Sequence, residues 1–144
     1  FGIMEILKRY NIPTAGKKVA VIGRSLIVGT PISILMSRNT EPGNATVTLL
    51  HSKSTNVKEV CLDSDIIIAA IGKKNFVTAD MVKEGAVIID VGINRVDGKI
   101  YGDVDFEHVA PKCAAITPVP GGVGLLTITS LLQNTLKSYQ LKQS

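Results

Sequence analysis

Short apolar runs alternate with amphipathic stretches along most of the chain. Ile3, Ile6, Leu7 and Tyr10 recur at the spacing of one helical face, so this pattern predicts an opening helix. Five apolar runs follow, each with the length and composition of a buried strand. The predicted strands span residues 19–22, 45–50, 65–71, 86–90 and 113–116.

The segments between the predicted strands contain helix and turn signals. Helices are predicted from Pro31, over 56–62, through 78–81 with Thr78 as cap, over 104–109 with Asp103 as cap, and over 125–139. Asp97 and Gly98 predict a hairpin turn. The strand at 65–71 has no polar alternation, so we expect it to be covered on both faces. Strands that alternate with helices predict an α/β fold, a Rossmann-like three-layer domain with a mostly parallel sheet.

Composition narrows the class of protein. The 144 residues suffice for one domain, 1–144, and 45% hydrophobic with 19% charged residues indicates a globular chain. The aromatic share of 4% and the scattered lysines behind the net charge of +4 argue against a nucleic-acid partner. No run is long enough to span a membrane. Cys61 and Cys113 lack metal-ligand spacing, so we expect no metal site and two thiols in a reducing cytosol.

The segment 17–36 has the pattern of an anion site. Its strand ends at Gly23. The polar pair Arg24 and Ser25 follows, and Gly29 precedes the helix start at Pro31. A glycine-bounded loop between a strand and a helix directs backbone N–H groups and the positive end of the helix dipole into one crevice. We therefore expect this crevice to hold the phosphates of a nucleotide.

The end of the second strand indicates which nucleotide. The usual G-x-G-x-x-G fingerprint and the ribose-binding acid that follows it are both missing. His51, Ser52 and Lys53 stand where that acid would lie, and a hydroxyl with cations favours a ribose phosphate. The pattern therefore favours NADP over NAD. The alternative is that Arg24 and Lys53 are ordinary surface charges.

The polar residues at the strand ends predict a ligand edge but no reactive group. Clusters at Gly23, His51, Gly72 and Gly92 are expected to line one edge of the sheet. The acids Asp90, Asp103 and Asp105 form no obvious dyad and are interpreted as caps and turn residues. His51 is as well placed for a ligand or solvent contact as for a base, and His108 is expected to be exposed. Lys73 and Lys74 are either surface residues or phosphate contacts. The sequence predicts no catalytic residue in this chain.

Four motifs together resemble a known enzyme family. The segments "VIGRSLIVGTP", "HSKS", "FVTADMVKEGAVIIDVGINRVDGKIYGDVDF" and "ITPVPGGVG" occur in the order typical of bifunctional methylenetetrahydrofolate dehydrogenase/methenyltetrahydrofolate cyclohydrolases. The chain resembles their C-terminal NADP-binding domain over nearly its whole length. Together with the strand-end analysis, the resemblance implies a cofactor site of Gly23, Arg24, Ser25, Gly29, Ser52, Lys53, Gly72 and Ile93, with Arg24 on the ribose phosphate and Ile93 on the nicotinamide side. It implies a folate-bordering loop of Pro118, Val119, Pro120, Gly121, Gly122, Val123 and Gly124.

The resemblance also implies partners. Such enzymes have an N-terminal folate-binding domain with a catalytic lysine and tyrosine, a tetrahydrofolate-type substrate and a homodimeric, cytoplasmic form. Because this chain starts at Phe1, we expect it to be a piece of a longer protein that, alone, binds NADP weakly and catalyses nothing. Segments 1–12 and 125–140 would join the two domains, leaving Ile3, Leu7, Leu132 and Leu136 exposed or paired with another chain.

The chain departs from the family at a few positions. Thr30 replaces a basic residue that the family usually has before the proline, and Leu125 and Leu126 replace Pro and Met near the folate side. Two alternatives stay open: an NAD-dependent monofunctional dehydrogenase relative, and a non-catalytic nucleotide-binding module.

Overall fold

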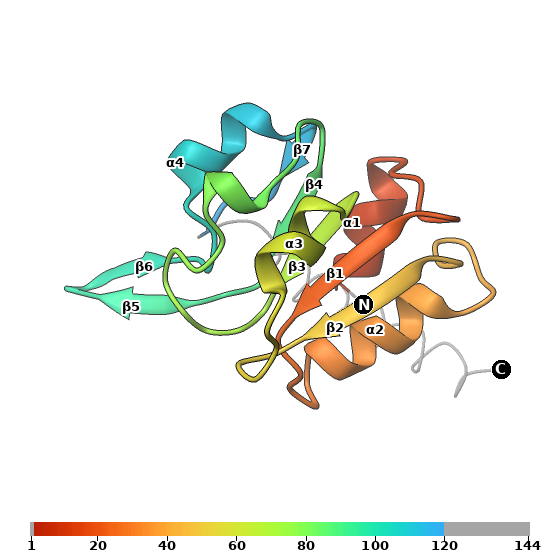
Figure 1. Cartoon of the computed structure of the whole chain (residues 1–144), viewed down its shortest axis with the longest axis horizontal. Helices are drawn as coiled ribbons and strands as arrows, with labels where there is room; N and C mark the ends of the chain where they lie inside the picture. The colour runs from red at the N-terminus through yellow and green to blue at the C-terminus, as the bar shows by residue number, and fades with distance from the viewer. Residues whose placement is uncertain (1, 120–144) are drawn as a thin grey trace, which may run out of the picture.

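The computed structural model describes residues 2–119, which form a three-layer α/β fold (Figure 1). The helices are α1 (Gly2–Arg9), α2 (Gly29–Ser37), α3 (Val57–Leu62) and α4 (Phe106–Val109), with the 3-10 turns η1 (Ala79–Met81) and η2 (Ala110–Lys112). The strands are β1 (Lys18–Ile22), β2 (Thr46–Leu50), β3 (Ile66–Ala69), β4 (Val87–Asp90), β5 (Asn94–Val96), β6 (Lys99–Tyr101) and β7 (Ala115–Ile116). The predicted closing helix, 125–139, lies outside the described residues.

Five of these strands form one parallel sheet in the order β2-β1-β3-β4-β7. The register aligns Ile22 with Leu50 on one side and with Ala69 on the other, and Ala69 with Asp90. Strands β5 and β6 pair antiparallel as a separate hairpin, which projects from the body of the molecule in Figure 1. Asp97 and Gly98 both have positive φ at its tip, as the predicted turn requires. The α/β, Rossmann-like prediction with a mostly parallel sheet is confirmed.

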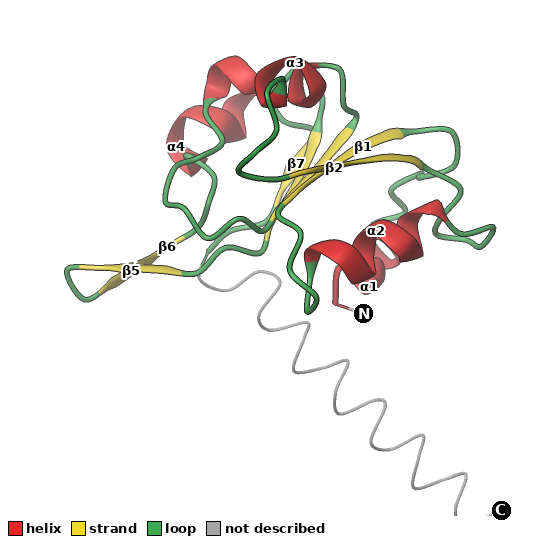
Figure 2. Ribbon diagram, turned by 60° about the horizontal axis from the view of Figure 1, so that its bottom comes forward, coloured by secondary structure: helices red, strands yellow, loops and turns green. Residues whose placement is uncertain are grey.

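Helices cover both faces of the sheet, as Figure 2 shows. On one face, α1 and α2 bury Ile3, Ile6, Leu7, Ile32 and Met36 against β1, β3 and β4. On the other, α3, η1 and α4 enclose a second apolar cluster that includes Ala20, Ile22, Ile67, Ile88 and Val109. All four residues of β3 are buried, which confirms that this strand is covered on both faces. Because each fully buried Ile contributes about 1.5–3 kcal/mol, this central strand anchors the fold.

One prediction about the opening helix is wrong. Ile3 and Leu7 are buried, with exposed fractions of 6% and 1%. They pack within this domain, in the same apolar cluster as Val19 and Ile66. The amphipathic face of α1 therefore covers the domain's own sheet, because β1 and β3 present an apolar surface that the helix buries. Leu132 and Leu136 lie outside the described residues.

Two predicted helix starts are also corrected. The second helix begins at Gly29 rather than Pro31, because Ser25 already organises the preceding turn: its Oγ accepts hydrogen bonds from the N–H groups of Val28 (3.0 Å) and Gly29 (3.4 Å). Asp103 caps no helix; Asp105 occupies the position before α4 instead. Asp103 is drawn away from that role by hydrogen bonds to two other loops, described below.

The helix predicted over 56–62 is present as α3, and the one predicted through 78–81 is present as the 3-10 turn η1. Thr78 does precede the turn η1, but its hydroxyl binds the Asp80 carboxylate rather than a backbone N–H. Within residues 2–119, no helix has both the length and the apolar character that a membrane crossing requires. The same residues place no group of three His, Cys, Asp or Glu side chains where they could hold a metal ion.

Candidate functional site

The carboxyl ends of β2, β1, β3 and β4 meet at one edge of the sheet. Backbone hydrogen bonds continue past the strands and hold the first loop residues in place. Gly23 N donates to Leu50 O (2.8 Å), Ala70 N to Ile22 O (2.7 Å), and Val91 N to Ala69 O (2.8 Å). The predicted clusters at Gly23, His51, Gly72 and Gly92 all follow these strand ends, so the loops that carry them leave the sheet from the same edge.

The loop between β1 and α2 folds tightly on itself. Gly23 has a φ of +113°, and a Cβ there would collide with the Ala70 carbonyl. A Cβ on Gly29 would collide with the Gly23 carbonyl, so this close approach requires glycine. The Thr30 hydroxyl donates to the Arg24 carbonyl (3.1 Å), and Thr30 N donates to Ser25 O (2.9 Å). Hydrogen bonds within the loop therefore define its shape.

Residues 24–27 of this loop are all exposed. Arg24 and Ser25 are exposed, and Leu26 and Ile27 are exposed by 85% and 89%. Among the described residues, no acidic side chain forms an ion pair with Arg24. A guanidinium in this state is available for an anionic ligand.

The turn after β2 places a hydroxyl and a cation beside the neighbouring strand end. His51 N donates to Ser54 Oγ (3.0 Å), and Lys53 N donates to His51 Nδ1 (3.2 Å). The imidazole therefore helps to form the turn, which accounts for it without a role as a base. Ser52 and Lys53 are exposed at the tip. The turn contains no carboxylate, and in the described part of the chain no acid forms an ion pair with Lys53.

Two buried carboxylates, Asp90 and Asp103, tie the ends of β3 and β4 together, whereas the sequence pattern indicated cap or turn residues at both positions. Asp90 is 4% exposed, and it accepts hydrogen bonds from the N–H groups of Gly92 (2.9 Å), Asp103 (3.0 Å) and Val104 (3.0 Å). Burial raises the pKa of Asp90, and the three backbone N–H groups oppose that rise. The local signal for this role is an acid that directly ends a fully apolar strand, "VIID", followed at a distance by the glycine-flanked "YGDVDF".

The other predicted residues at this edge are more open. Gly72 has a φ of +78°, and nothing lies within 4 Å of where its Cβ would be. Ile93 is 66% exposed. Lys74 Nζ lies 3.7 Å from the centre of the Tyr101 ring, and Lys73 Nζ lies 5.9 Å from that of Phe76. These cation–π contacts account for both lysines without a phosphate ligand. His108 is exposed, as expected, and its Nδ1 lies 2.8 Å from Asp105.

The start of the predicted folate-bordering loop is attached to β4. Asp90 N donates to Thr117 Oγ1 (2.9 Å), and Thr117 N donates to Ile88 O (3.1 Å). Pro118 is exposed, and Val119 lines a cavity of about 310 Å³ with Asp90, Lys74, Tyr101 and Phe106. Pro120, Gly121, Gly122, Val123 and Gly124 lie outside the described residues.

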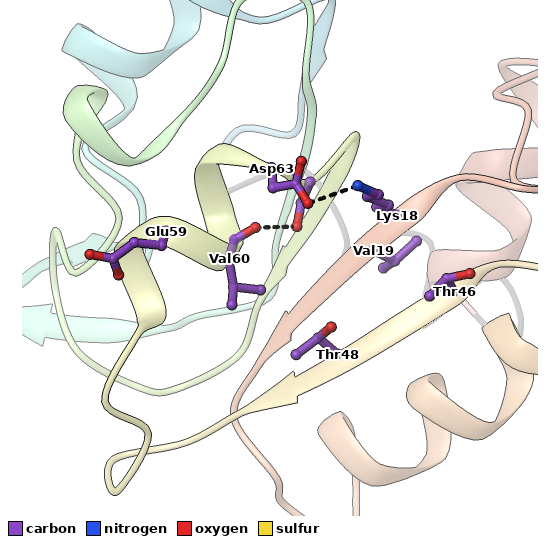
Figure 3. Close-up of a pocket in the computed structure, with 8 residues that line it drawn as sticks. Lys18, Val19, Thr46, Thr48, Glu59, Val60 and Asp63 are labelled. Carbon is purple, nitrogen blue, oxygen red and sulfur yellow. Dashed lines mark hydrogen bonds and ion pairs between the residues drawn. The ribbon is translucent and has the colours of Figure 1, made fainter.

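A second cavity lies away from this edge, between α3 and the strands β1 and β2 (Figure 3). Its lining includes Thr46 and Thr48 of β2 and Glu59 of α3, and an ion pair of 2.9 Å joins Lys18 Nζ to Asp63 across its rim. None of the predicted site residues contributes to it. The candidate site is therefore the loop edge rather than this cavity.

Comparison with known proteins decides the family. The family model described as "Tetrahydrofolate dehydrogenase/cyclohydrolase, NAD(P)-binding domain" matches residues 1–143. The chain belongs to this family. It is 59% identical to the Bifunctional protein FolD of Cytophaga hutchinsonii, over 99% of this chain and 51% of that protein. The chain thus spans about half the length of such relatives.

Solved structures of the family have the same fold. The bifunctional enzyme FolD, a methylenetetrahydrofolate dehydrogenase/cyclohydrolase of Campylobacter jejuni, superposes with a TM-score of 0.92 at 47% identity, over 98% of this chain and 49% of that one. The methylenetetrahydrofolate dehydrogenase-cyclohydrolase of Trypanosoma brucei, complexed with NADP cofactor and inhibitor, gives 0.89 at 36% identity, again over 98% and 49%. The recognised resemblance to this family is confirmed.

The residues of this chain fit the cofactor of the family's NAD(P)-binding domain. Glycines at 23 and 29 keep the first loop close to the sheet, and a cation and a hydroxyl are exposed at each of the first two strand ends. A carboxylate, which would repel a ribose phosphate, is missing from the turn after β2. The described edge therefore suits a phosphorylated dinucleotide.

Proposed function

We propose that this chain is the NADP-binding part of a folate one-carbon enzyme. The proposed enzyme oxidises methylenetetrahydrofolate to methenyltetrahydrofolate and hydrolyses that product to formyltetrahydrofolate. Membership of the tetrahydrofolate dehydrogenase/cyclohydrolase family supports the proposal, as do the bifunctional enzymes that share the fold. In purine and amino-acid biosynthesis, such a protein would supply one-carbon units.

One observation carries the choice of NADP. The exposed Arg24 and Ser25 follow β1, and the exposed Ser52 and Lys53 follow the neighbouring strand β2. We propose that Arg24 binds the ribose phosphate with its planar guanidinium, and that Ser52 and Lys53 donate to the same group. Gly29 lets the start of α2 approach the pyrophosphate, because any side chain there would displace the loop.

The remaining residues orient the other half of the cofactor. Gly72 and Ile93, which follow β3 and β4, would lie along the nicotinamide side. NADP, when bound, supplies the hydride acceptor. The contribution of this chain is to bind it and to hold the nicotinamide ring within reach of the folate.

We propose that the folate lies between this domain and a preceding one. Pro118, Val119, Pro120, Gly121, Gly122, Val123 and Gly124 would border it from this side. A lysine and a tyrosine of the preceding domain would carry out proton transfer, since nothing in the site described above is placed as a general base. Segments 1–12 and 125–140 would join the domains, and the whole protein would be a cytoplasmic homodimer.

Competitive binding tests this proposal. We expect NADP to bind this chain more tightly than NAD, by about tenfold or more, because a charge-assisted bond to phosphate is worth roughly 1.5–3 kcal/mol. Replacement Arg24→Gln should weaken NADP binding by about tenfold and leave NAD binding unchanged. Isothermal titration calorimetry at fixed ionic strength measures both.

Arg38→Gln is the matched control for this experiment. Arg38 is an exposed arginine that directly follows α2, at the opposite end of that helix from the candidate site, so its loss should change neither affinity. Equal affinity for NADP and NAD would instead favour an NAD-dependent dehydrogenase. Binding of NADP without turnover by the full-length protein would favour a non-catalytic nucleotide-binding module.

A further inference from the structure

Asp103 is a buried acid that bridges two segments of the candidate site: the loop after β3, and the start of β5, which the loop after β4 leads into. Its side chain has an exposed fraction of 0%. Its Oδ2 accepts hydrogen bonds from the N–H groups of Ile71 (2.7 Å) and Gly72 (2.9 Å), in the loop after β3. Its Oδ1 accepts a hydrogen bond from Asn94 Nδ2 (2.9 Å), next to Ile93 in the segment after β4. One carboxylate thus holds both segments at a fixed separation.

The bridge is itself held rigidly. Asp103 N donates to Asp90 Oδ1 (3.0 Å), and Asp90 is the last residue of β4. A Cβ on Gly92 would collide with the Asp103 carboxylate, and a Cβ on Gly102 would collide with that of Asp90. The two carboxylates therefore occupy spaces that only glycine leaves open, which fixes their rotamers. The backbone of Asp103 also holds the far end of the loop after β3, because Val77 N donates to Asp103 O (2.9 Å).

Backbone and amide N–H groups are the described hydrogen-bond partners of the Asp103 carboxylate. In the described part of the chain, no Lys, Arg or His forms an ion pair with it. Backbone and amide N–H groups satisfy the carboxylate, so removal of the side chain would leave three donors without their acceptor. Such a loss releases the loops that carry Gly72 and Ile93, but it does not reach the turn that carries Ser52 and Lys53.

We infer that Asp103 is a positioning residue for the nicotinamide half of the cofactor. It acts by fixing the loop after β3 relative to the loop after β4. This inference rests on the proposed function, and it separates the site into two parts. Arg24, Ser52 and Lys53 serve the phosphate end, whereas Asp103 shapes the opposite end without touching the ligand.

Two ligands test the separation on the 144-residue chain. NADP contacts both ends of the site, whereas adenosine 2′,5′-bisphosphate lacks the nicotinamide half. We expect Asp103→Ala to raise the Kd of NADP by about tenfold, because the hydrogen bonds that the carboxylate accepts are lost. The Kd of the bisphosphate should change less than about twofold. Asp103→Asn should keep most of the NADP affinity of the unaltered chain. The carbonyl of the new side chain can accept from Ile71 and Gly72, and its amide can donate to a rotated Asn94 side chain.

Thr14→Val is the matched control for lost stability. Thr14 is also 0% exposed, and its hydroxyl bonds both Gly43 O (2.7 Å) and Gly43 N (2.8 Å), away from the loops at the carboxyl edge. It should lower the melting temperature without changing either Kd. Should Asp103→Ala not fold, Asn94→Ala removes only one arm of the bridge and should show the same selective loss for NADP, to a smaller degree.

The outcomes separate this inference from the proposed function. Equal weakening of both ligands by Asp103→Ala, or no weakening of either, overturns the positioning role. If the unaltered chain binds neither ligand, the proposed function fails. Amide hydrogen exchange without ligand then tests whether Asp103 holds the two segments together. Asp103→Ala should accelerate exchange at 71–72 and at 93–95 together, and unchanged exchange at either segment overturns the inference.

Discussion

At the residue scale, the two cysteines show how burial controls reactivity. Cys61, a residue of α3, is completely buried, and burial raises its pKa to about 11. Cys113 is half-buried, and burial raises its pKa too, although nearby Lys112 opposes that rise. Since the thiolate is the nucleophile, both thiols should react slowly at neutral pH.

Alkylation of the native chain measures the reactivity of each thiol. We expect iodoacetamide at about pH 7.5 to label Cys113 before Cys61, with Cys61 labelled only as fast as the chain opens. Mass spectrometry of tryptic peptides reports each site separately. Both cysteines should react at equal rates in urea, which serves as the control. Faster labelling of Cys61 in the native chain would contradict its placement in the core.

The residues at the candidate site differ in how readily the sequence reveals them. The positions of Arg24, Ser52 and Lys53 at the ends of β1 and β2 were predictable, because each follows a clear strand and the missing acid is visible in the sequence itself. Asp103 was not, because its partners Ile71, Gly72 and Asn94 are set by tertiary contacts. An aspartate before a short helix is a common cap signal, and local rules therefore assigned it that role.

At the scale of elements, Asp65 joins three segments at the amino end of β3. Its carboxylate accepts from Lys83 Nζ (2.7 Å) and from the backbone N–H of Lys18 (2.9 Å), which begins β1. The hydrogen bond from Lys83, followed by that from Lys18, holds the pKa of Asp65 below its ordinary value. A carboxyl whose pKa is lowered by folding stabilises the fold above its unfolded pKa, about 3.9. That contribution is lost as the pH falls through the folded pKa.

Replacement Asp65→Asn should therefore reduce the free energy of unfolding at neutral pH and not in acid. We expect a loss of up to about 1 kcal/mol at pH 7, since the pair is partly exposed, and a difference from the unaltered chain that disappears as the pH falls through the lowered folded pKa of Asp65. Urea unfolding across this pH range measures both. Asp63→Asn is the control, because its ion pair with Lys18 is largely exposed and should add little. A loss that stays constant with pH would show that the charge of Asp65 is not responsible.

Element boundaries show where sequence patterns stop being informative. The strands predicted at 45–50 and 113–116 begin later in the structure, at Thr46 and Ala115, and the strand predicted at 65–71 spans only Ile66–Ala69. Apolar composition does not mark where ladder pairing begins or ends, because apolar residues such as Ile71 lie outside the ladder. The helix after the glycine loop starts two residues early, since Ser25 supplies acceptors that the sequence pattern did not assign. The hairpin at 94–101, by contrast, was predictable from Asp97 and Gly98 alone, because its turn has few alternatives.

At the scale of the whole molecule, the layers predict a gradient of stability. Strand β3 lies in the middle of the sheet with all its residues buried, whereas the hairpin β5–β6 pairs only with itself. Native-state hydrogen exchange should therefore be slowest in Ile66–Ala69 and fast in residues 94–101. Mass spectrometry of the exchanged chain gives both rates. Equal protection of hairpin and central strand would indicate that the hairpin packs against another surface in solution.

The order of the sheet was the least accessible feature from sequence. Five strands and right-handed crossovers predicted a parallel sheet, but several orders satisfy that rule. Apolar composition separates inner strands from edge strands but does not fix their order: in β2-β1-β3-β4-β7, the buried β1 and β3 lie inside, and β2, with its exposed Thr46 and Thr48, forms an edge. That edge position is also why the turn bearing Ser52 and Lys53 lies at one end of the site.

The pairing of glycines with carboxylates at the ends of β3 and β4 has a consequence for the evolution of this domain. Gly102 cannot acquire a side chain while Asp90 is present, and Asp90 cannot be lost without stranding three N–H groups. The same holds for Gly92 and Asp103. Single substitutions at any of the four positions are therefore costly, and only joint changes avoid both the collision and the unpaired donors. Descendants of this sequence should keep the four positions as a set, whatever happens to the ligand they serve.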